Sequence, residues 1–145
     1  MSFTNSFLTA ICQAVVDIDS PQFPYVYKTG TDVYADNDVA ITWEIEPELA
    51  RVITVQDYPV DDDISISDSV VGVQFKITGD LAFVKGAVDD IFDLFHGLQS
   101  TTLGGVRVVM AGRRSGAALG QDESGRVSRS ENYYFTVHRP SPNRT

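Results

Sequence analysis

The chain of 145 residues has one cysteine, Cys12, and two histidines, His96 and His138. A lone cysteine excludes an internal disulfide and a thiolate metal cluster, and Cys12 falls within an apolar helical pattern that favours core packing. Neither histidine has an i, i+4 partner or an HExxH context. We therefore expect no metal ion and no cofactor.

The motifs that carry catalysis are also missing. The sequence has no GxSxG elbow and no GxxxxGK[ST] loop, and the glycines of residues 112–125 lack GxGxxG spacing after a strand. The acidic run 61–63 lacks the glycine and distal glutamate of an EF-hand loop, which favours a solvated turn over a calcium site. Asp89, Asp90 and Asp93 fall on the predicted outer face of a helix. We therefore predict no catalytic residue and expect that the protein is not an enzyme.

Long apolar runs are absent. No stretch approaches the roughly 20 apolar residues of a membrane span, and residues 1–20 lack the basic start and long apolar core of a signal peptide. We expect a soluble protein, made in a cytoplasm, with no membrane contact. A hydrophobic content of 43% over 145 residues suits one globular domain covering residues 1–145.

Charge is distributed unevenly along the chain. Residues 1–100 hold 17 acids and 4 bases, a net charge of -13, whereas residues 101–145 hold 3 acids and 7 arginines, a net charge of +4. The acidic part would repel phosphate, and the chain has neither a lysine cluster nor a basic helix, which argues against nucleic-acid binding. Contact between the basic part of one copy and the acidic part of another fits this distribution better.

The stretch from Val70 to Leu98 has the clearest local pattern. Apolar residues alternate with mostly polar ones up to Ile77, which predicts a strand with one apolar face. Gly79 and Asp80 then provide a turn and a helix cap. From that point apolar residues recur every three or four positions, which predicts an amphipathic helix from Leu81 to Leu98 with Gly97 at its end.

The other elements follow from the same two periodicities. The sequence predicts a helix at 3–18, strands at 25–27, 39–45, 51–56, 106–110 and 130–138, and loops at 100–105 and 112–127. It therefore predicts an α+β fold, with two helices on one face of a mixed, mostly antiparallel β-sheet and a long loop before the last strand. Residues 112–128 are expected to form a mobile assembly loop because they carry few apolar side chains, and residues 140–145 a flexible tail.

Two segments resemble a known family. The segment GVQFKITGDLAFVKGAVDDIFDLFHGL (72–98) is similar to the strand, glycine turn and helix of the minor capsid and tail-completion proteins of long-tailed phages. The segment GQDESGRVSRSENYYFTVHR (120–139) is similar to their closing strand. Together they resemble the tail terminator, or tail-to-head joining, family. Lys76 is a departure, since an arginine is expected before the glycine, although the charge is kept.

The resemblance implies a structural virion protein, located at the tail-head junction and assembled in the host cytoplasm. Such a subunit forms a homo-oligomeric ring, commonly a hexamer, that caps the tail tube protein, ends tube growth and presents a surface to the head-completion or stopper protein. DNA passes through the lumen of the ring without specific binding. Two alternatives stay open: another neck component, such as a head-tail connector or stopper, and a small cytoplasmic ligand-binding or enzymatic α+β domain with a cleft beside Trp43.

The closing segment supplies the candidate interface residues. By motif match they are Asp122, Gly125, Arg126, Ser130, Asn132 and Tyr133, to which the basic C-terminal part adds Arg113, Arg114 and Arg129. A planar guanidinium pairs with carboxylates in two hydrogen bonds, so we expect these arginines at contacts between proteins. The structural alternative is that Gly125 serves a turn and Asn132 caps the backbone.

Overall fold

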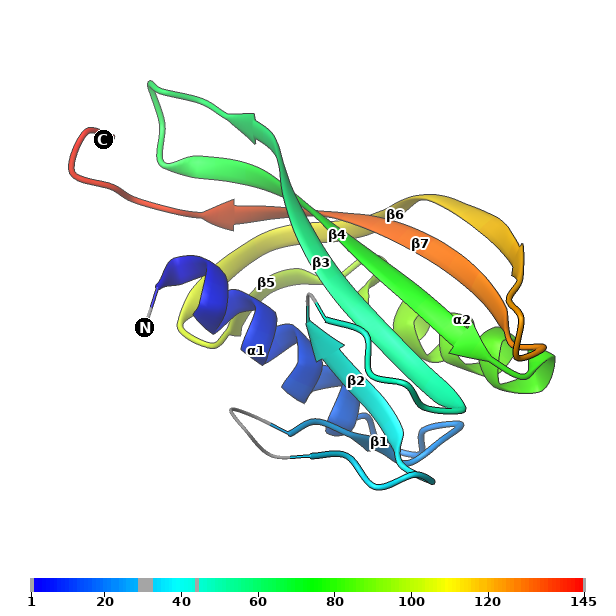
Figure 1. Cartoon of the computed structure of the whole chain (residues 1–145). Helices are drawn as coiled ribbons and strands as arrows, with labels where there is room; N and C mark the ends of the chain where they lie inside the picture. The colour runs from blue at the N-terminus through cyan, green and yellow to red at the C-terminus, as the bar shows by residue number, and fades with distance from the viewer. Residues whose placement is uncertain (1, 29–32, 44, 145) are drawn as a thin grey trace.

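The computed structural model describes residues 2–28, 33–43 and 45–144. The described residues form two helices and seven strands, whose course along the chain can be followed in Figure 1. They are α1 (Phe3–Val16), β1 (Tyr25–Val26), β2 (Val39–Trp43), β3 (Arg51–Asp62), β4 (Asp68–Gly79), α2 (Leu81–Phe95), β5 (Gln99–Leu103), β6 (Val106–Gln121) and β7 (Val127–His138). Among the described residues, no helix has the length and apolar character needed to cross a membrane.

All seven strands belong to one sheet in the order β1-β2-β3-β4-β7-β6-β5. The pairs β1–β2 and β2–β3 are parallel, and the other four neighbouring pairs are antiparallel. The sheet is strongly twisted, and α1 and α2 lie on the same side of it (Figure 1), where both helices contribute to a single apolar core. The predicted α+β fold, with two helices on one face of a mixed, mostly antiparallel sheet, is therefore confirmed.

The predicted strand-turn-helix unit is present in β4 and α2. The Asp80 side chain accepts a hydrogen bond from the backbone N–H of Phe83 at 3.2 Å and so caps α2. Helix α2 ends at Phe95, earlier than the sequence predicts, because Gly97 turns with φ +84° and donates its N–H to the carbonyl of Ala111 in β6. The chain thereby leaves the helix and starts the next strand pairing.

Aromatic side chains form the centre of the core. Phe95 is fully buried, and its ring centroid lies 5.7 Å from that of Phe75 and 5.3 Å from that of Phe135. The three rings come from α2, β4 and β7, so their contacts hold the helix to the two central strands.

Two residues of α2 differ from the predicted pattern. Leu81 is 60% exposed although it belongs to the predicted apolar stripe, and Asp90 is buried although it was assigned to the outer face. The Asp90 carboxylate accepts hydrogen bonds from the Tyr25 hydroxyl at 2.6 Å and the Gln22 N–H at 2.9 Å. Burial, together with Asp90, raises the pKa of Tyr25 above its ordinary value. A distant segment therefore covers this side of α2, which helical periodicity alone does not reveal.

The prediction of a long loop at residues 112–127 is wrong. Residues 112–121 continue β6 in antiparallel pairing with β7, and only 122–126 form the turn. The register shifts at three places in β6, and such bulges interrupt the alternation by which a strand is recognised in sequence. Few apolar side chains are needed there, since this half of the strand is exposed and is held by backbone pairing. Whether residues 112–128 are mobile in the free subunit stays a prediction.

Other strands also extend beyond their predicted ends. Strand β3 does not end at residue 56, as predicted, but continues to Asp62, with a register shift between Pro59 and Asp61. Proline is tolerated there because β2 pairs only with the first part of β3, up to Val55. The predicted loop at 100–105 is mostly strand β5, and Glu44, in the predicted strand 39–45, lies outside the described residues.

The C-terminal residues run beside the start of β4. The Arg144 guanidinium donates four hydrogen bonds of 2.6 to 3.0 Å, to the carbonyls of Ile66, Asp68 and Arg139 and to the Ser69 hydroxyl. The predicted flexible tail is thus tied to the sheet through Arg144, and Thr145 lies outside the described residues.

Replacing Phe95 by alanine should lower the free energy of unfolding by about 3 to 5 kcal/mol, because the change leaves a cavity between α2 and the sheet. Chemical denaturation of both proteins measures this difference. Leu81→Ala, at an exposed position of the same helix, serves as the control and should cost well under about 1 kcal/mol. A loss of that small size for Phe95→Ala would contradict the described core.

Candidate assembly surface

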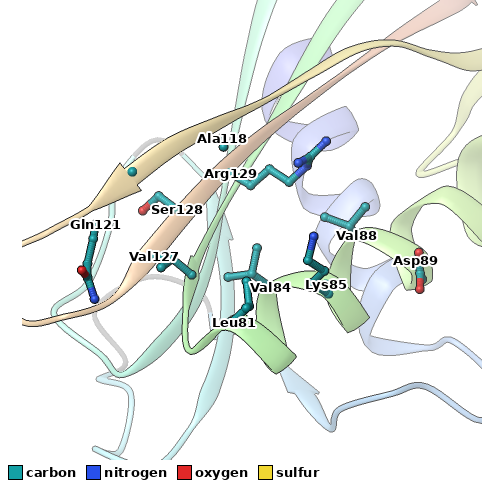
Figure 2. Close-up of a pocket in the computed structure, with 11 residues that line it drawn as sticks. Leu81, Val84, Lys85, Val88, Asp89, Ala118, Gln121, Val127, Ser128 and Arg129 are labelled. Carbon is teal, nitrogen blue, oxygen red and sulfur yellow. The ribbon is translucent and has the colours of Figure 1, made fainter.

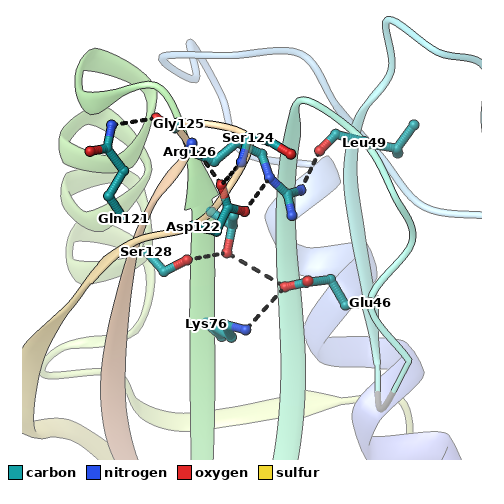
Figure 3. A network of polar contacts seen from close by, with 10 residues as sticks. Glu46, Leu49, Lys76, Gln121, Asp122, Ser124, Gly125, Arg126 and Ser128 are labelled. Carbon is teal, nitrogen blue, oxygen red and sulfur yellow. Dashed lines mark hydrogen bonds and ion pairs between the residues drawn. The ribbon is translucent and has the colours of Figure 1, made fainter.

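The turn between β6 and β7 is built around Asp122. One oxygen of its carboxylate, Oδ1, accepts the backbone N–H groups of Ser124 and Arg126 at 3.0 and 2.9 Å, and Oδ2 accepts the Arg126 Nε–H at 2.8 Å (Figure 3). Gly125 adopts φ +82°, a left-handed conformation that favours glycine. Asp122, Gly125 and Arg126 of the family-like motif therefore come together in one closed turn.

The turn is also fixed to the other side of the sheet. Arg126 Nη1 donates to the Leu49 carbonyl, in the segment that precedes β3, at 2.6 Å (Figure 3). Close by, the Lys76 ammonium lies 3.4 Å from the Glu46 carboxylate. Arg126 thus uses its guanidinium within the subunit, which gives this residue a structural role whatever it contacts in an assembly.

A buried ion cluster holds the outer half of the hairpin together. The Glu131 side chain is fully buried, and its two carboxylate oxygens lie 3.2 Å from Arg113 Nη1 and 3.1 Å from Arg129 Nε. Both arginines are about one-third exposed, at 39% and 35%. The cluster carries one negative and two positive charges, so a net positive charge remains at the surface of the hairpin.

Gly116 makes room for this cluster. A Cβ atom at this position would overlap the Glu131 carboxylate, whereas a Cβ at Gly112 of the same strand would meet nothing closer than 3.7 Å, at His96. Neither glycine has a positive φ. Gly116 is therefore required for space and not for backbone conformation.

Aromatic rings orient the two arginines of β6. The guanidinium carbon of Arg113 lies 4.6 Å from the ring centroid of Phe92, and that of Arg114 lies 5.0 Å from the ring centroid of Tyr134. The backbone N–H of Arg113 donates to His96 Nδ1 at 3.0 Å. These contacts hold positively charged side chains against the end of α2 and the hairpin, in positions where a partner can reach them.

The remaining candidates are not equally accessible. Tyr133 is fully buried in the core and Ser130 is 5% exposed, so the structure does not present these two at the surface. Burial raises the pKa of the Tyr133 hydroxyl, which has no hydrogen-bond partner among the described residues. Asn132 is partly exposed and bridges the Tyr58 and Ser115 hydroxyls, each at 3.2 Å.

Sequence reasoning missed Glu131 and Gly116, and it did not predict that His96 accepts the backbone N–H of Arg113. One signal was available for Glu131, because it stands in the same alternation as the core residues Tyr133 and Phe135 of β7. A carboxylate on an inward-facing position requires a paired cation, and Arg129, two residues before it, is one such cation.

An apolar groove of about 480 Å³ lies between α2 and the outer half of the hairpin (Figure 2). Its lining includes Leu81, Val84 and Val88 from α2, Ala118 from β6, and Val127 and Arg129 from β7. The groove lies away from Trp43, which is half-buried and donates its indole N–H to the Tyr27 hydroxyl at 2.9 Å. Among the described residues, no group of three or more His, Cys, Asp or Glu side chains could hold a metal ion.

Comparisons with known proteins give a likeness in fold alone. No model of a known protein family matches the chain, and no curated protein matches it. The structure is similar to a chain in a solved structure described as the virion of a native gene transfer agent particle, with a TM-score of 0.52 and 17% sequence identity. The match covers 68% of this chain and 78% of the other.

Gly116→Ala should destabilise the subunit by about 1 to 3 kcal/mol, because the new methyl group displaces the Glu131 carboxylate from its two arginines. The matched control is Gly112→Ala, which adds the same methyl group to the same strand where space is free. Equal unfolding free energies for the two variants would show that the buried ion cluster does not constrain the hairpin.

The pH dependence of the turn follows from Asp122. Desolvation by itself raises the pKa of Asp122, but the hydrogen bonds from the Arg126 backbone and side chain outweigh it and hold the pKa below its ordinary value of 3.8. The carboxylate therefore stabilises the turn above that value, and this contribution is lost as the pH falls through the lowered pKa. The amide resonances of Ser124 and Arg126 should titrate with a midpoint below pH 3.8 and should not titrate in this way in Asp122→Asn. Midpoints above that pH would contradict the described turn.

Proposed function

We propose that the protein is a structural subunit of a phage-like virion, which forms a ring that caps the tail tube, ends tube growth and joins the tail to the head. The likeness of its fold to a chain of a gene transfer agent virion carries this proposal. A ring at the tail-head junction contacts copies of itself at its sides, the tail tube protein on one face and a head-completion protein on the other.

The two family-like segments form one physical unit. The first contains most of β4 and all of α2, and the second contains the Asp122 turn and β7. Strand β4 pairs with β7 along its whole length, from Asp68–His138 to Gly79–Val127. Segments that are about 20 residues apart in the sequence are therefore neighbours in the sheet, so the two family-like segments form one packed unit.

The charge distribution supports assembly in place of nucleic-acid binding. The net charge of -13 on residues 1–100 would repel a passing duplex, which favours sliding without retention. The arginines of the hairpin, Arg113 and Arg129, are already bound to Glu131 and are oriented toward the surface beside α2. We propose that they contact neighbouring proteins, with no cofactor and no catalytic role.

Addition of the purified protein to polymerising tail tube protein should stop tube growth. The capped ends should carry a ring whose mass is a whole-number multiple of the subunit mass, which is six times that mass for a hexamer. Electron microscopy of tube lengths and mass measurement of the caps test both points. The free protein should show no salt-sensitive binding to duplex DNA.

Three outcomes would contradict this assignment. Unaltered tube growth, with binding to the portal side of the neck, would identify a connector or stopper. Tight, salt-dependent DNA binding by the free subunit would place the arginines in the lumen. Failure to bind any tail or head component would reject a virion role altogether.

A further inference from the structure

The outer half of β6 has an open edge. Strand β5 pairs with β6 only from Val106 to Met110, and the backbone of residues 97–98 then bonds to Ala111. Among the described residues, no strand pairs with the edge of β6 that faces away from β7 between Arg114 and Gln121. A strand in this state presents unpaired N–H and C=O groups, which are a template for another strand.

This edge carries few of the features that prevent pairing. The segment RSGAALGQ contains no proline, lysine or acidic residue, and its only charge is that of Arg114. Two bulges bound a regular stretch from Ser115 to Ala118, which pairs residue by residue with β7. A subunit that leaves such a strand exposed is expected to cover it in an assembly.

A second open edge lies on the other side of the sheet and has the opposite charge. Strand β2 pairs with β3 only from Arg51 to Val55, so among the described residues the outer edge of β3 from Gln56 to Asp62 is unpaired. This segment contains three aspartates and no base, and pairing along it would be interrupted at Pro59 and at the register shift between Pro59 and Asp61. Two such edges would repel each other, whereas one of them can accept a positively charged strand.

We propose that the open edge of β6 in one copy pairs with the open acidic edge of β3 in the next copy, so that the sheets join head to tail. Contacts between two different surfaces close into a ring when the rotation per subunit permits it. Arg114 and the excess positive charge around Glu131 then face Asp57, Asp61 and Asp62. The proposal extends the ring of the proposed function by naming the surfaces that join its subunits.

Apolar contacts add to the backbone pairing. Val60, on the β3 edge, is 38% exposed, and Ile64, in the loop after it, is 87% exposed. The groove beside α2 is lined partly by Ala118 of β6, so a strand that lies along β6 brings its side chains next to this groove. Pairing by the backbone with side chains in adjacent pockets is a recurring mode of strand recognition.

Single cysteines at the two edges test the proposal. Treated alone with a short bis-maleimide, Ala117→Cys and Val60→Cys should each form no crosslinked product. A mixture of the two variants should form a crosslinked dimer. A chain that carries both substitutions should form a ladder of products whose largest member contains as many subunits as the ring. Wild-type protein is a control because Cys12 is fully buried, and Asp36→Cys, at an exposed site away from both edges, is a second.

Charge reversal gives an independent measurement. Arg114→Glu and Asp61→Arg should each weaken self-association about tenfold, measured by sedimentation, and the variant with both changes should recover it.

In the crosslinking experiment, a crosslinked dimer from Ala117→Cys alone would show β6–β6 pairing and overturn the proposal. A mixture of Ala117→Cys and Val60→Cys that yields no product would overturn it as well. If the variants cap tubes but form no crosslink, the edge-pairing proposal fails and the proposed function stands. If crosslinked rings form but cap no tube, the proposed function fails and the edge-pairing proposal stands.

Discussion

The pairing of β4 with β7 is the contact on which the other features depend. It runs the full length of both strands and occupies the middle of the seven-stranded sheet. It places Phe75 beside Tyr133, with ring centroids 5.6 Å apart, and Phe95 of α2 packs against both. The register set by this pairing also decides which residues of β7 face the helices, because a shift by one residue would reverse every side chain.

One consequence of that register is that Glu131 faces inward. A buried carboxylate is tolerated only with close cations, and Arg113 and Arg129 supply them. Arg113 belongs to β6, so the ion cluster joins the two strands of the hairpin beyond the region that the apolar core supports. Gly116 leaves the space that the carboxylate occupies. The outer hairpin is thus ordered by a polar cluster and backbone pairing, with little apolar burial of its own.

This explains which parts of the structure the sequence predicts. Strand β4 and helix α2 follow from local periodicity and from the Asp80 cap, and the structure confirms them. The extension of β6 depends on a partner strand and on bulges, which leave no regular pattern, and Asp90 is buried by a segment about 65 residues away. For the candidate surface, Asp122, Gly125 and Arg126 of the motif form one local turn, and their contact with a partner stays a prediction. The motif match also made Tyr133 a candidate for contact with a partner, although the alternation of Tyr133, Phe135 and Val137 places it on the buried face of β7.

The order of the strands also converts the charge gradient of the chain into two different edges. Strand β3 comes from the acidic first hundred residues and β6 from the basic remainder, and the topology places their open edges on opposite sides of the central pair. With a net charge of -9, free copies repel one another at long range, whereas the edges attract only within about 8 Å at physiological ionic strength. Edge pairing between free subunits therefore works against this long-range repulsion and depends on the attraction between the two proposed edges at short range. The proposed head-to-tail contact brings together two edges of opposite charge, whereas a contact between two β3 edges would bring aspartates together and would be opposed at every distance.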